Sequence, residues 1–174
     1  EIVGHLIDLG HRRIAHIRGH AAHGASRWRA DGYRDALKRA GIEFDPALMV
    51  QGEFSFDSGM QAARGLLDLA DPPTAIFAGN DDMAAGAVRV ALERGLSVPG
   101  QLSVCGFDDI PIAHQIFPAL TTVRQPAREM GATAAAELLK CMRDPSQAQM
   151  RRLPHSLCLR ASTGPAPRNR VGVD

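Results

Sequence analysis

Polar side chains follow each of four short apolar runs in this 174-residue sequence. The run at 75–78 leads to Asn80 and Asp81, and the run at 102–107 leads to Asp108 and Asp109. The two earlier runs, at 13–17 and 48–50, lead to a second group of polar and aromatic residues: His20, His23, Ser26, Arg29, Glu53 and Phe54. In a parallel sheet the carboxyl ends of the strands meet at one edge, where ligands bind. The sequence therefore predicts one ligand site built from these loops.

The residue types in this group suit a small, hydroxyl-rich ligand such as a sugar. Carboxylate and amide oxygens accept hydrogen bonds from ligand hydroxyls, and the Arg29 guanidinium donates to ligand oxygens. Phe54 or Trp28 offers an aromatic face to the apolar side of such a ligand.

Each residue also has an ordinary structural interpretation. Asn80 and Asp81 stand at the start of a predicted helix, where such side chains commonly cap free backbone N–H groups. Asp108 can cap the segment that follows it, Arg29 can be a solvated or ion-paired helix residue, and Phe54 can belong to the edge of a core. Both interpretations stay open at this point.

Metal binding and catalysis have weaker support. Asp108 and Asp109 could hold Mg²⁺, but no phosphate-binding loop accompanies them. His20 and His23 could bind zinc, but no third ligand stands at a recognisable spacing. The sequence also has no G-x-x-x-x-G-K-[ST], G-x-G-x-x-G, G-x-S-x-G or H-E-x-x-H motif. We therefore expect no cofactor, no metal and no enzymatic activity.

The composition is that of an ordinary globular chain. Hydrophobic residues make up 45% and charged residues 22%, and 174 residues suffice for one domain with a real core. The net charge of +1 gives no electrostatic signature for nucleic acid or an anionic membrane. No apolar run reaches the roughly 18 residues of a spanning helix, and the first residues lack the features of a signal peptide. We therefore expect no membrane partner.

Cys105, Cys141 and Cys158 are widely spaced in the sequence. Cys105 and Cys158 lie in apolar runs, which favours buried, reduced thiols over disulfides or zinc ligands.

Helical and strand patterns alternate up to residue 109. Predicted helices at 1–9, 27–40, about 57–69 and 81–94 alternate with the apolar runs. Such alternation is typical of the α/β class, with an open, mostly parallel sheet and helices on both faces. Because the chain opens in a helix, with no strand before it and no initiator Met, we expect it to be a piece of a longer protein.

The pattern changes after Asp109. Residues 111–120 show little periodicity, 121–124 read as a strand, Pro126 starts a helix that ends near 144, and 157–159 form a last strand. One strand and one helix are too little to bury a core of their own. We therefore expect exposed apolar surface and non-native association there, and a frayed tail over 164–174.

Five segments together resemble one known family. They stand in the family's order and comprise His5–Ala15 (HLIDLGHRRIA), Pro73–Ala84 (PTAIFAGNDDMA), Leu102–Asp109 (LSVCGFDD), Pro118–Pro126 (PALTTVRQP) and Leu159–Thr163 (LRAST). These sequence segments resemble those of LacI/GalR-type transcription regulators, and the match runs from about Glu1 to Thr163.

The resemblance implies a type I periplasmic-binding-protein fold, in which two α/β subdomains enclose a ligand cleft. Residues 1–111 and 152–163 would then form the C-terminal, effector-binding subdomain. Residues 116–145 would be the last strand and helix of an N-terminal subdomain that is otherwise largely missing, as is the helix-turn-helix. This agrees with the unpartnered strand and helix described above.

The resemblance also implies which side chains touch the effector: Arg29, Phe54, Asn80, Asp108 and Gln125. Arg29 matches the arginine three residues before the Gly32–Tyr33 pair, and Gln125 matches a glutamine of the hinge strand. His23 and Ala25 stand at positions that vary with the effector, so the ligand is not named beyond a carbohydrate or related small polar molecule.

The function implied is effector binding and dimerisation in a cytoplasmic regulator, a repressor or an activator. The family often dimerises through helix 83–94 and the segment after Asp109. Operator DNA would be bound only through the missing N-terminal domain. The alternative is a periplasmic sugar-binding protein of a transport system, which would act as a monomer, and a third reading is an enzyme on the same scaffold. The segments LTTVRQP and LGHRR favour the regulator.

Overall fold

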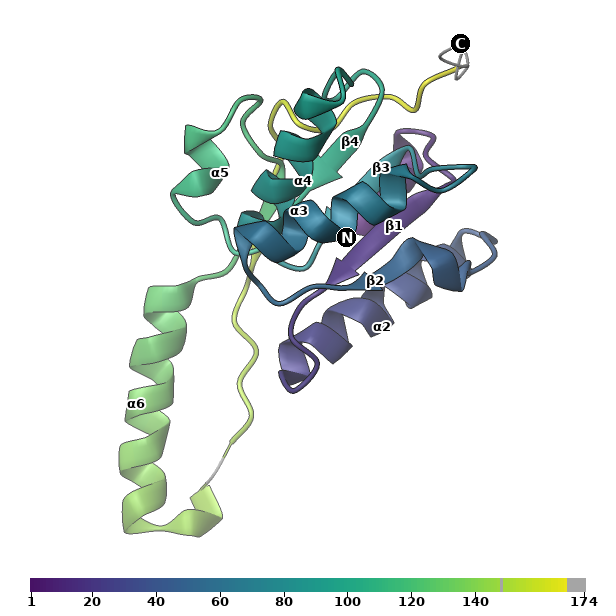
Figure 1. Cartoon of the computed structure of the whole chain (residues 1–174). Coiled ribbons are helices and arrows are strands. Elements are labelled where there is room, and N and C mark those ends of the chain that lie inside the picture. Colours follow the sequence, from purple (N-terminus) through teal and green to yellow (C-terminus); the bar gives the residue numbers. More distant parts are fainter. Residues whose placement is uncertain (148, 169–174) are drawn as a thin grey trace.

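A four-stranded parallel sheet forms the centre of the molecule, in a computed structural model that describes residues 1–147 and 149–168 (Figure 1). Its strands are β1 (Ile14–Arg18), β2 (Met49–Gln51), β3 (Ala75–Ala78) and β4 (Ser103–Cys105), in the order β2-β1-β3-β4. The register places His16 beside both Met49 and Phe77. The predicted parallel α/β sheet is confirmed, although β4 is shorter than the predicted strand at 102–107.

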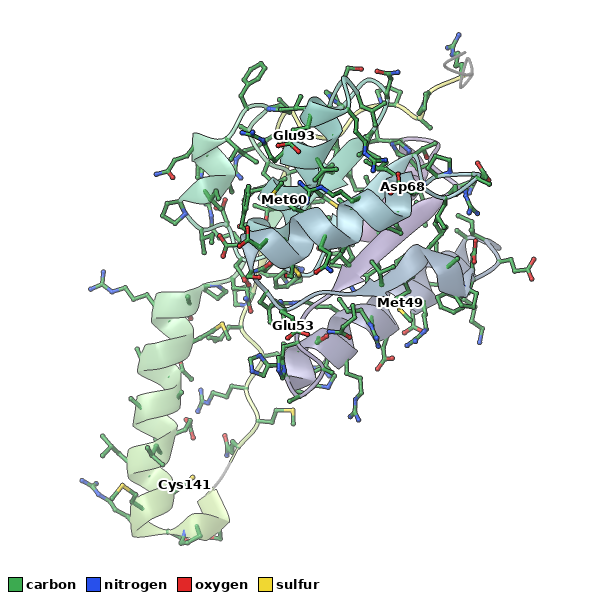
Figure 2. All side chains as sticks on the ribbon, viewed as in Figure 1. Met49, Glu53, Met60, Asp68, Glu93 and Cys141 are labelled. Carbon is green, nitrogen blue, oxygen red and sulfur yellow. The ribbon has the colours of Figure 1, made fainter. Side chains whose placement is uncertain are left out.

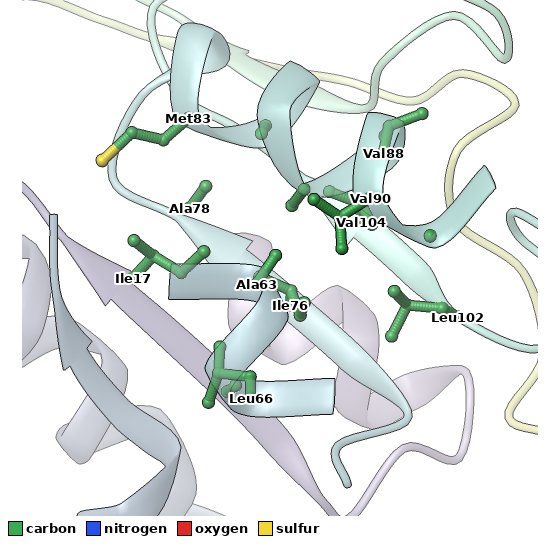
Figure 3. Close-up of a cluster of buried hydrophobic side chains, with 14 of the residues drawn as sticks. Ile17, Ala63, Leu66, Ile76, Ala78, Met83, Val88, Val90, Leu102 and Val104 are labelled. Carbon is green, nitrogen blue, oxygen red and sulfur yellow. The ribbon is translucent and has the colours of Figure 1, made fainter. Parts of the chain in front are cut away.

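Helices cover both faces of this sheet. Helices α1 (Ile2–Asp8) and α2 (Gly24–Arg39) pack on one face, against Ile14, Phe77 and Cys105. Helices α3 (Phe56–Leu67) and α4 (Asp81–Glu93) pack on the other face, against Ile17 and Val104 (Figure 3). Because both faces are covered, every residue of β3 and β4 is buried.

Helix α2 begins earlier than predicted. Residues 24–26 were expected in a loop, but the helix begins at Gly24. Ser26 N–H already donates to the His23 carbonyl, and its hydroxyl donates to the carbonyl of Gly19 at 2.8 Å. The small residues at 24–26 therefore form the first helical turn, and this turn sets the position of Arg29.

Helices α3 and α4 approach each other closely because glycines face the contact. A Cβ atom added at Gly59 would overlap the backbone of Met83, and one added at Gly86 would overlap the carbonyl oxygen of Phe56. Side chains at these two positions would push the helices apart.

After β4 the chain first forms α5 (Ile112–Gln115), whose Ala113 is buried in the same core as residues of α4. A smaller second unit comprises β5 (Thr122–Arg124), α6 (Ala127–Arg143), a 3₁₀ turn at Pro145–Gln147 and β6 (Ser156–Cys158); another 3₁₀ turn, Pro46–Leu48, precedes β2. Strands β5 and β6 pair antiparallel, with Val123 opposite Leu157. The short helix α5 was not predicted, because four residues between prolines carry no readable helical period.

Helix α6 projects away from the rest of the molecule (Figure 1). Figure 2 shows Cys141 near its far end, well away from the main sheet. No residue of α6 is buried within the described chain, and the large apolar side chains Met130, Leu138, Leu139 and Met142 are exposed. The exposed apolar surface expected from the sequence is therefore present.

The start of the predicted tail is held to the main sheet. Gly164 N–H donates to Ser103 Oγ, the Gly164 carbonyl accepts from buried His11, and Ala166 N–H donates to the Leu9 carbonyl at 2.8 Å. The prediction of a frayed tail is wrong for these residues, because their backbone groups find partners at the sheet's amino end. Residues 169–174 of the predicted tail lie outside the described residues.

All three cysteines are free thiols. Cys105 is buried as predicted, and burial raises the pKa of its thiol well above the ordinary value. Cys158 is only half-buried, contrary to expectation, because β6 lies at the edge of a two-stranded sheet.

No described helix is both long enough and apolar enough to cross a bilayer.

Candidate functional site

Arg29 lies at the centre of the predicted site. One guanidinium nitrogen donates to the carbonyl of Gly79 at 2.6 Å, and the other donates to Asp108 Oδ1 at 3.2 Å. The guanidinium carbon also lies 3.9 Å from the ring centre of Phe107. Burial lowers the pKa of Arg29, and the nearby carboxylates Asp108 and Asp81 oppose this shift. Helix α2 thus holds a cation over the carboxyl ends of β3 and β4.

Asp108 joins this cation to the second unit of the chain. Its Oδ1 accepts from Arg29 and from Gln125 Nε2, the latter at 2.6 Å. Among the described residues, no side chain or backbone group donates to Asp108 Oδ2. Burial raises the pKa of Asp108, and the Arg29 charge partly offsets the rise. Asp108 therefore keeps one acceptor oxygen for a ligand.

The backbone at Asp108 and Phe54 adopts an uncommon conformation. Asp108 has φ of 109° and Phe54 has φ of 61°, values that non-glycine residues rarely take. Such local strain is typical of functional sites in folded proteins.

Phe54 forms an aromatic wall beside Arg29. Its ring lies against Gly19, where an added Cβ would overlap it. The ring centre lies 5.8 Å from the guanidinium carbon of Arg29. The His23 ring stacks on Phe54 at a centroid distance of 5.6 Å. Next to it, His20 Nε2 lies 3.5 Å from a carboxylate oxygen of Glu53, a residue that Figure 2 places near the start of α2.

Asn80 serves as the N-cap of α4. Its Oδ1 accepts from Met83 N–H at 3.1 Å, and its Nδ2 donates to the carbonyl of Phe54 at 2.9 Å. The side chain is 7% exposed. The capping interpretation is therefore confirmed for Asn80, and the residue also positions Phe54. Contact between Asn80 and an effector stays a prediction.

Gln125 lies directly after β5, beside two open hollows. One, of about 420 Å³, is lined by Phe107, Gln125 and residues of α6 and 149–155, and the other, of about 730 Å³, by Asp108, Gln125 and the start of α6. Arg29, Phe54 and Asn80 line neither hollow. Direct contacts nevertheless link the five predicted residues to one another.

Sequence reasoning missed Phe107 and misplaced Trp28. Phe107 stacks under Arg29, and it can be found by alternation along the strand, which puts it on the same face as Cys105. Trp28 is 69% exposed, and no ring contact among residues 1–147 and 149–168 joins it to the site. Consecutive helix residues face different directions, so Arg29 turns inward while Trp28 does not.

The possible metal sites at Asp108 with Asp109 and at His20 with His23 have no third metal-binding side chain among the described residues. No group of three His, Cys, Asp or Glu side chains in residues 1–147 and 149–168 could hold a metal ion. Asp109 accepts hydrogen bonds from Arg124 and Arg160. What remains is a set of hydrogen-bond donors, acceptors and rings suited to binding a polar small molecule.

Known proteins share both the sequence and the fold. The chain is 42% identical over 142 residues to the HTH-type transcriptional repressor CytR of Escherichia coli strain K12, covering 82% of this chain and 42% of that protein. Structures with the same fold include a transcriptional regulator CelR–cellobiose complex (38% identity, TM-score 0.85, 92% of this chain and 49% of that one). A LacI family transcriptional regulator from Enterococcus faecium with bound ribose is also similar (35% identity, TM-score 0.83, covering 94% of this chain and 61% of that one).

These similarities confirm the resemblance to LacI-type regulators, and the matched proteins are named as regulators rather than enzymes. The chain spans about half the length of the curated relatives it matches, for example 49% of the regulator DegA of Bacillus subtilis. Residues 3–163 match the family model of the periplasmic binding protein-like domain. The chain therefore belongs to the periplasmic binding protein-like domain family.

Proposed function

We propose that this chain is the effector-binding and dimerisation region of a LacI/GalR-type transcription regulator, and that its effector is a small carbohydrate. The network that joins Arg29, Asp108 and Gln125 carries the proposal. It brings together a helix, the end of a strand and the second unit of the chain at one point. Similar proteins have been solved with cellobiose and with ribose.

Sugar hydroxyls would act as both donors and acceptors at this point. Asp108 Oδ2 accepts from a hydroxyl, while Arg29 donates to a ring or hydroxyl oxygen. The Phe54 ring offers an aromatic face to the apolar C–H side of the sugar. Arg29 and Asp108 are already oriented by their contacts with Gly79 and Gln125, so binding orders few side chains.

The domain arrangement is part of the proposal. Residues 1–111 with 152–163 form one lobe of a two-lobed effector domain, and residues 116–145 belong to the other lobe. Effector binding shifts the population between two lobe arrangements and so changes DNA binding by a helix-turn-helix elsewhere in the cytoplasmic protein. The dimer forms through α4 and the segment after Asp109. Residues 1–174 alone are expected not to bind an operator.

Titration calorimetry with ribose and cellobiose tests the effector assignment. We expect heat of binding from one of these sugars, lost in Arg29→Ala and in Asp108→Ala with little change in fold. Arg27→Ala and Asp35→Ala are matched controls, because both side chains are exposed on α2. Unchanged affinity in both site variants would refute the site, and no heat from either sugar would refute this choice of effector.

A further inference from the structure

Three chain segments meet where the second unit joins the main sheet, and we call them the crossings: 105–110, 120–124 and 156–162. The chain passes to α6 through 120–124 and returns through 156–162, while 105–110 leads from β4 to α5 and runs beside them. The first two run side by side, since Gly106 N–H donates to the Thr121 carbonyl at 3.0 Å and Asp108 N–H to the Val123 carbonyl at 2.9 Å. The third pairs with the second through β6. Helix α6 is attached to the main sheet through these crossings (Figure 1).

Asp81 binds two of the three crossings from the main-sheet side. Its carboxylate is fully buried at the start of α4. Oδ1 accepts from the Thr122 hydroxyl at 2.5 Å, and Oδ2 accepts from Ile110 N–H at 2.9 Å. Gly106 makes room for this carboxylate, because an added Cβ there would overlap Asp81 Oδ1. One side chain thus ties the first crossing to the second.

Asp109 ties the crossings together a second time. Its side chain is only 3% exposed, and its Oδ2 accepts from Arg124 Nε at 2.6 Å. Oδ1 accepts from Arg160, which lies on the third crossing, at 2.5 Å, and His114 lies 3.4 Å away. Buried carboxylates are unfavourable unless such partners are present, so both sites depend on their geometry.

Each of these carboxylates directly follows a predicted effector residue in the chain. Asp81 follows Asn80, and Asp109 follows Asp108. Each of these carboxylates therefore stands one planar peptide unit away from a predicted effector residue.

We propose that Asp81 and Asp109 are positioning residues that form a clasp on the three crossings. The clasp fixes the orientation of the second unit against the main sheet. It also transmits changes at Asn80 and Asp108 to the crossings, and this second part rests on the proposed effector site. Neither side chain needs to touch the effector.

Amide hydrogen exchange of the full 174-residue chain tests the clasp without any sugar, so its outcome is independent of the effector assignment. Thr122→Val removes the hydroxyl and keeps the shape of the side chain. We expect exchange at Asp108, Ile110 and residues 122–124 to accelerate about ten-fold or more, while the amides of β1 and β3 keep their rates.

Two matched variants separate the clasp from general destabilisation. Thr122→Ser restores the donor and should restore slow exchange. Thr133→Val makes the same change on α6, where the hydroxyl has no hydrogen bond within the described chain, and should leave the crossings unchanged. Equal exchange in wild type and Thr122→Val would overturn the clasp, and so would an acceleration that spreads evenly to β1 and β3.

The transmission step has its own readout. If ribose or cellobiose binds, its affinity should fall about ten-fold in Thr122→Val and recover in Thr122→Ser, although the Thr122 hydroxyl donates to Asp81 and not to a predicted effector residue. Loosened crossings with unchanged sugar affinity would overturn the transmission and leave the clasp in place.

Discussion

Arg29 combines a charge with a fork of donors and a flat surface, and the site uses all three. Its two terminal nitrogens reach the Gly79 carbonyl and Asp108 Oδ1, and its face covers Phe107. A lysine carries the same charge on a single nitrogen that cannot make these contacts together.

Arg29→Lys should therefore weaken effector binding about ten-fold to a hundred-fold. The measurement is calorimetric titration with whichever of ribose and cellobiose binds the wild type. Arg27→Lys, on the exposed side of α2, is the matched control. Wild-type affinity in Arg29→Lys would mean that charge alone suffices and that the fork geometry is unimportant.

His16 makes the folded state sensitive to acid. The ring is fully buried between Tyr33 and Phe77, and its Nδ1 donates to the Phe77 carbonyl at 2.9 Å. Its Nε2 has no partner in the described chain. Burial therefore lowers the pKa of His16 to about 4, from an ordinary value of 6.5.

The unfolded chain then binds a proton that the folded chain does not, between these two pKa values. Stability from neutral His16 is complete above pH 6.5 and is lost as the pH falls towards 4, by about 3 kcal/mol in total. Urea unfolding at pH 7 and pH 5 should show a smaller difference in His16→Phe than in wild type. The other histidines are present in both proteins, so their contributions to the pH dependence cancel. An equal difference between pH 7 and pH 5 in the two proteins would refute the assignment of this acid sensitivity to His16.

The candidate site could be predicted in part from residue types. Asp108 contacts both Arg29 and Gln125, and the positions of these residues after strands or in family motifs were the signal. The contrasting orientations of Asn80 and Asp81 could not be predicted, because both are polar residues at one helix start. Only the folded backbone decides that Asn80 caps α4 while Asp81 reaches Thr122.

At the scale of elements, α3 and α4 depend on glycine for their close contact. Gly59 faces the backbone of Met83, whereas Gly65 in the same helix has nothing near the position of a Cβ atom. A methyl group at Gly59 would therefore meet backbone atoms, whereas one at Gly65 would meet open space.

Gly59→Ala should lower the free energy of unfolding by about 1–3 kcal/mol, because the methyl group overpacks the helix contact. Gly65→Ala should raise it by about 0.5–1 kcal/mol, since alanine favours the helix and meets no obstacle. Urea titrations of both variants make the comparison. Stabilisation in both would show that the helices separate easily and that the contact is not tight.

Elements with a strong period could be predicted and the short ones could not. The main strands and α1 to α4 carry apolar residues at regular spacing, and each was found to within a few residues. Helix α5 has four residues and lies where two prolines obscure any period. Its position depends instead on Ala113, which is buried against the neighbouring core.

At the scale of the whole molecule, the second unit lacks a core. Strands β5 and β6 form a sheet of two, and α6 leaves its apolar side chains uncovered in the described chain. The sequence allowed this prediction, because one strand and one helix cannot bury enough apolar surface to be stable alone. The clasp at Asp81 and Asp109 holds this unit at one end only.

Such a surface should drive self-association of residues 1–174 by the hydrophobic effect. We expect light scattering to give a mass above that of a monomer, rising with concentration. A double variant, Leu138→Gln with Leu139→Gln, should reduce the mass, because both side chains are exposed on α6. Lys140→Gln on the same helix should leave the mass unchanged. If α4 also mediates a dimer, the double variant will settle at twice the monomer mass. A wild type that stays monomeric at all concentrations would contradict the whole prediction.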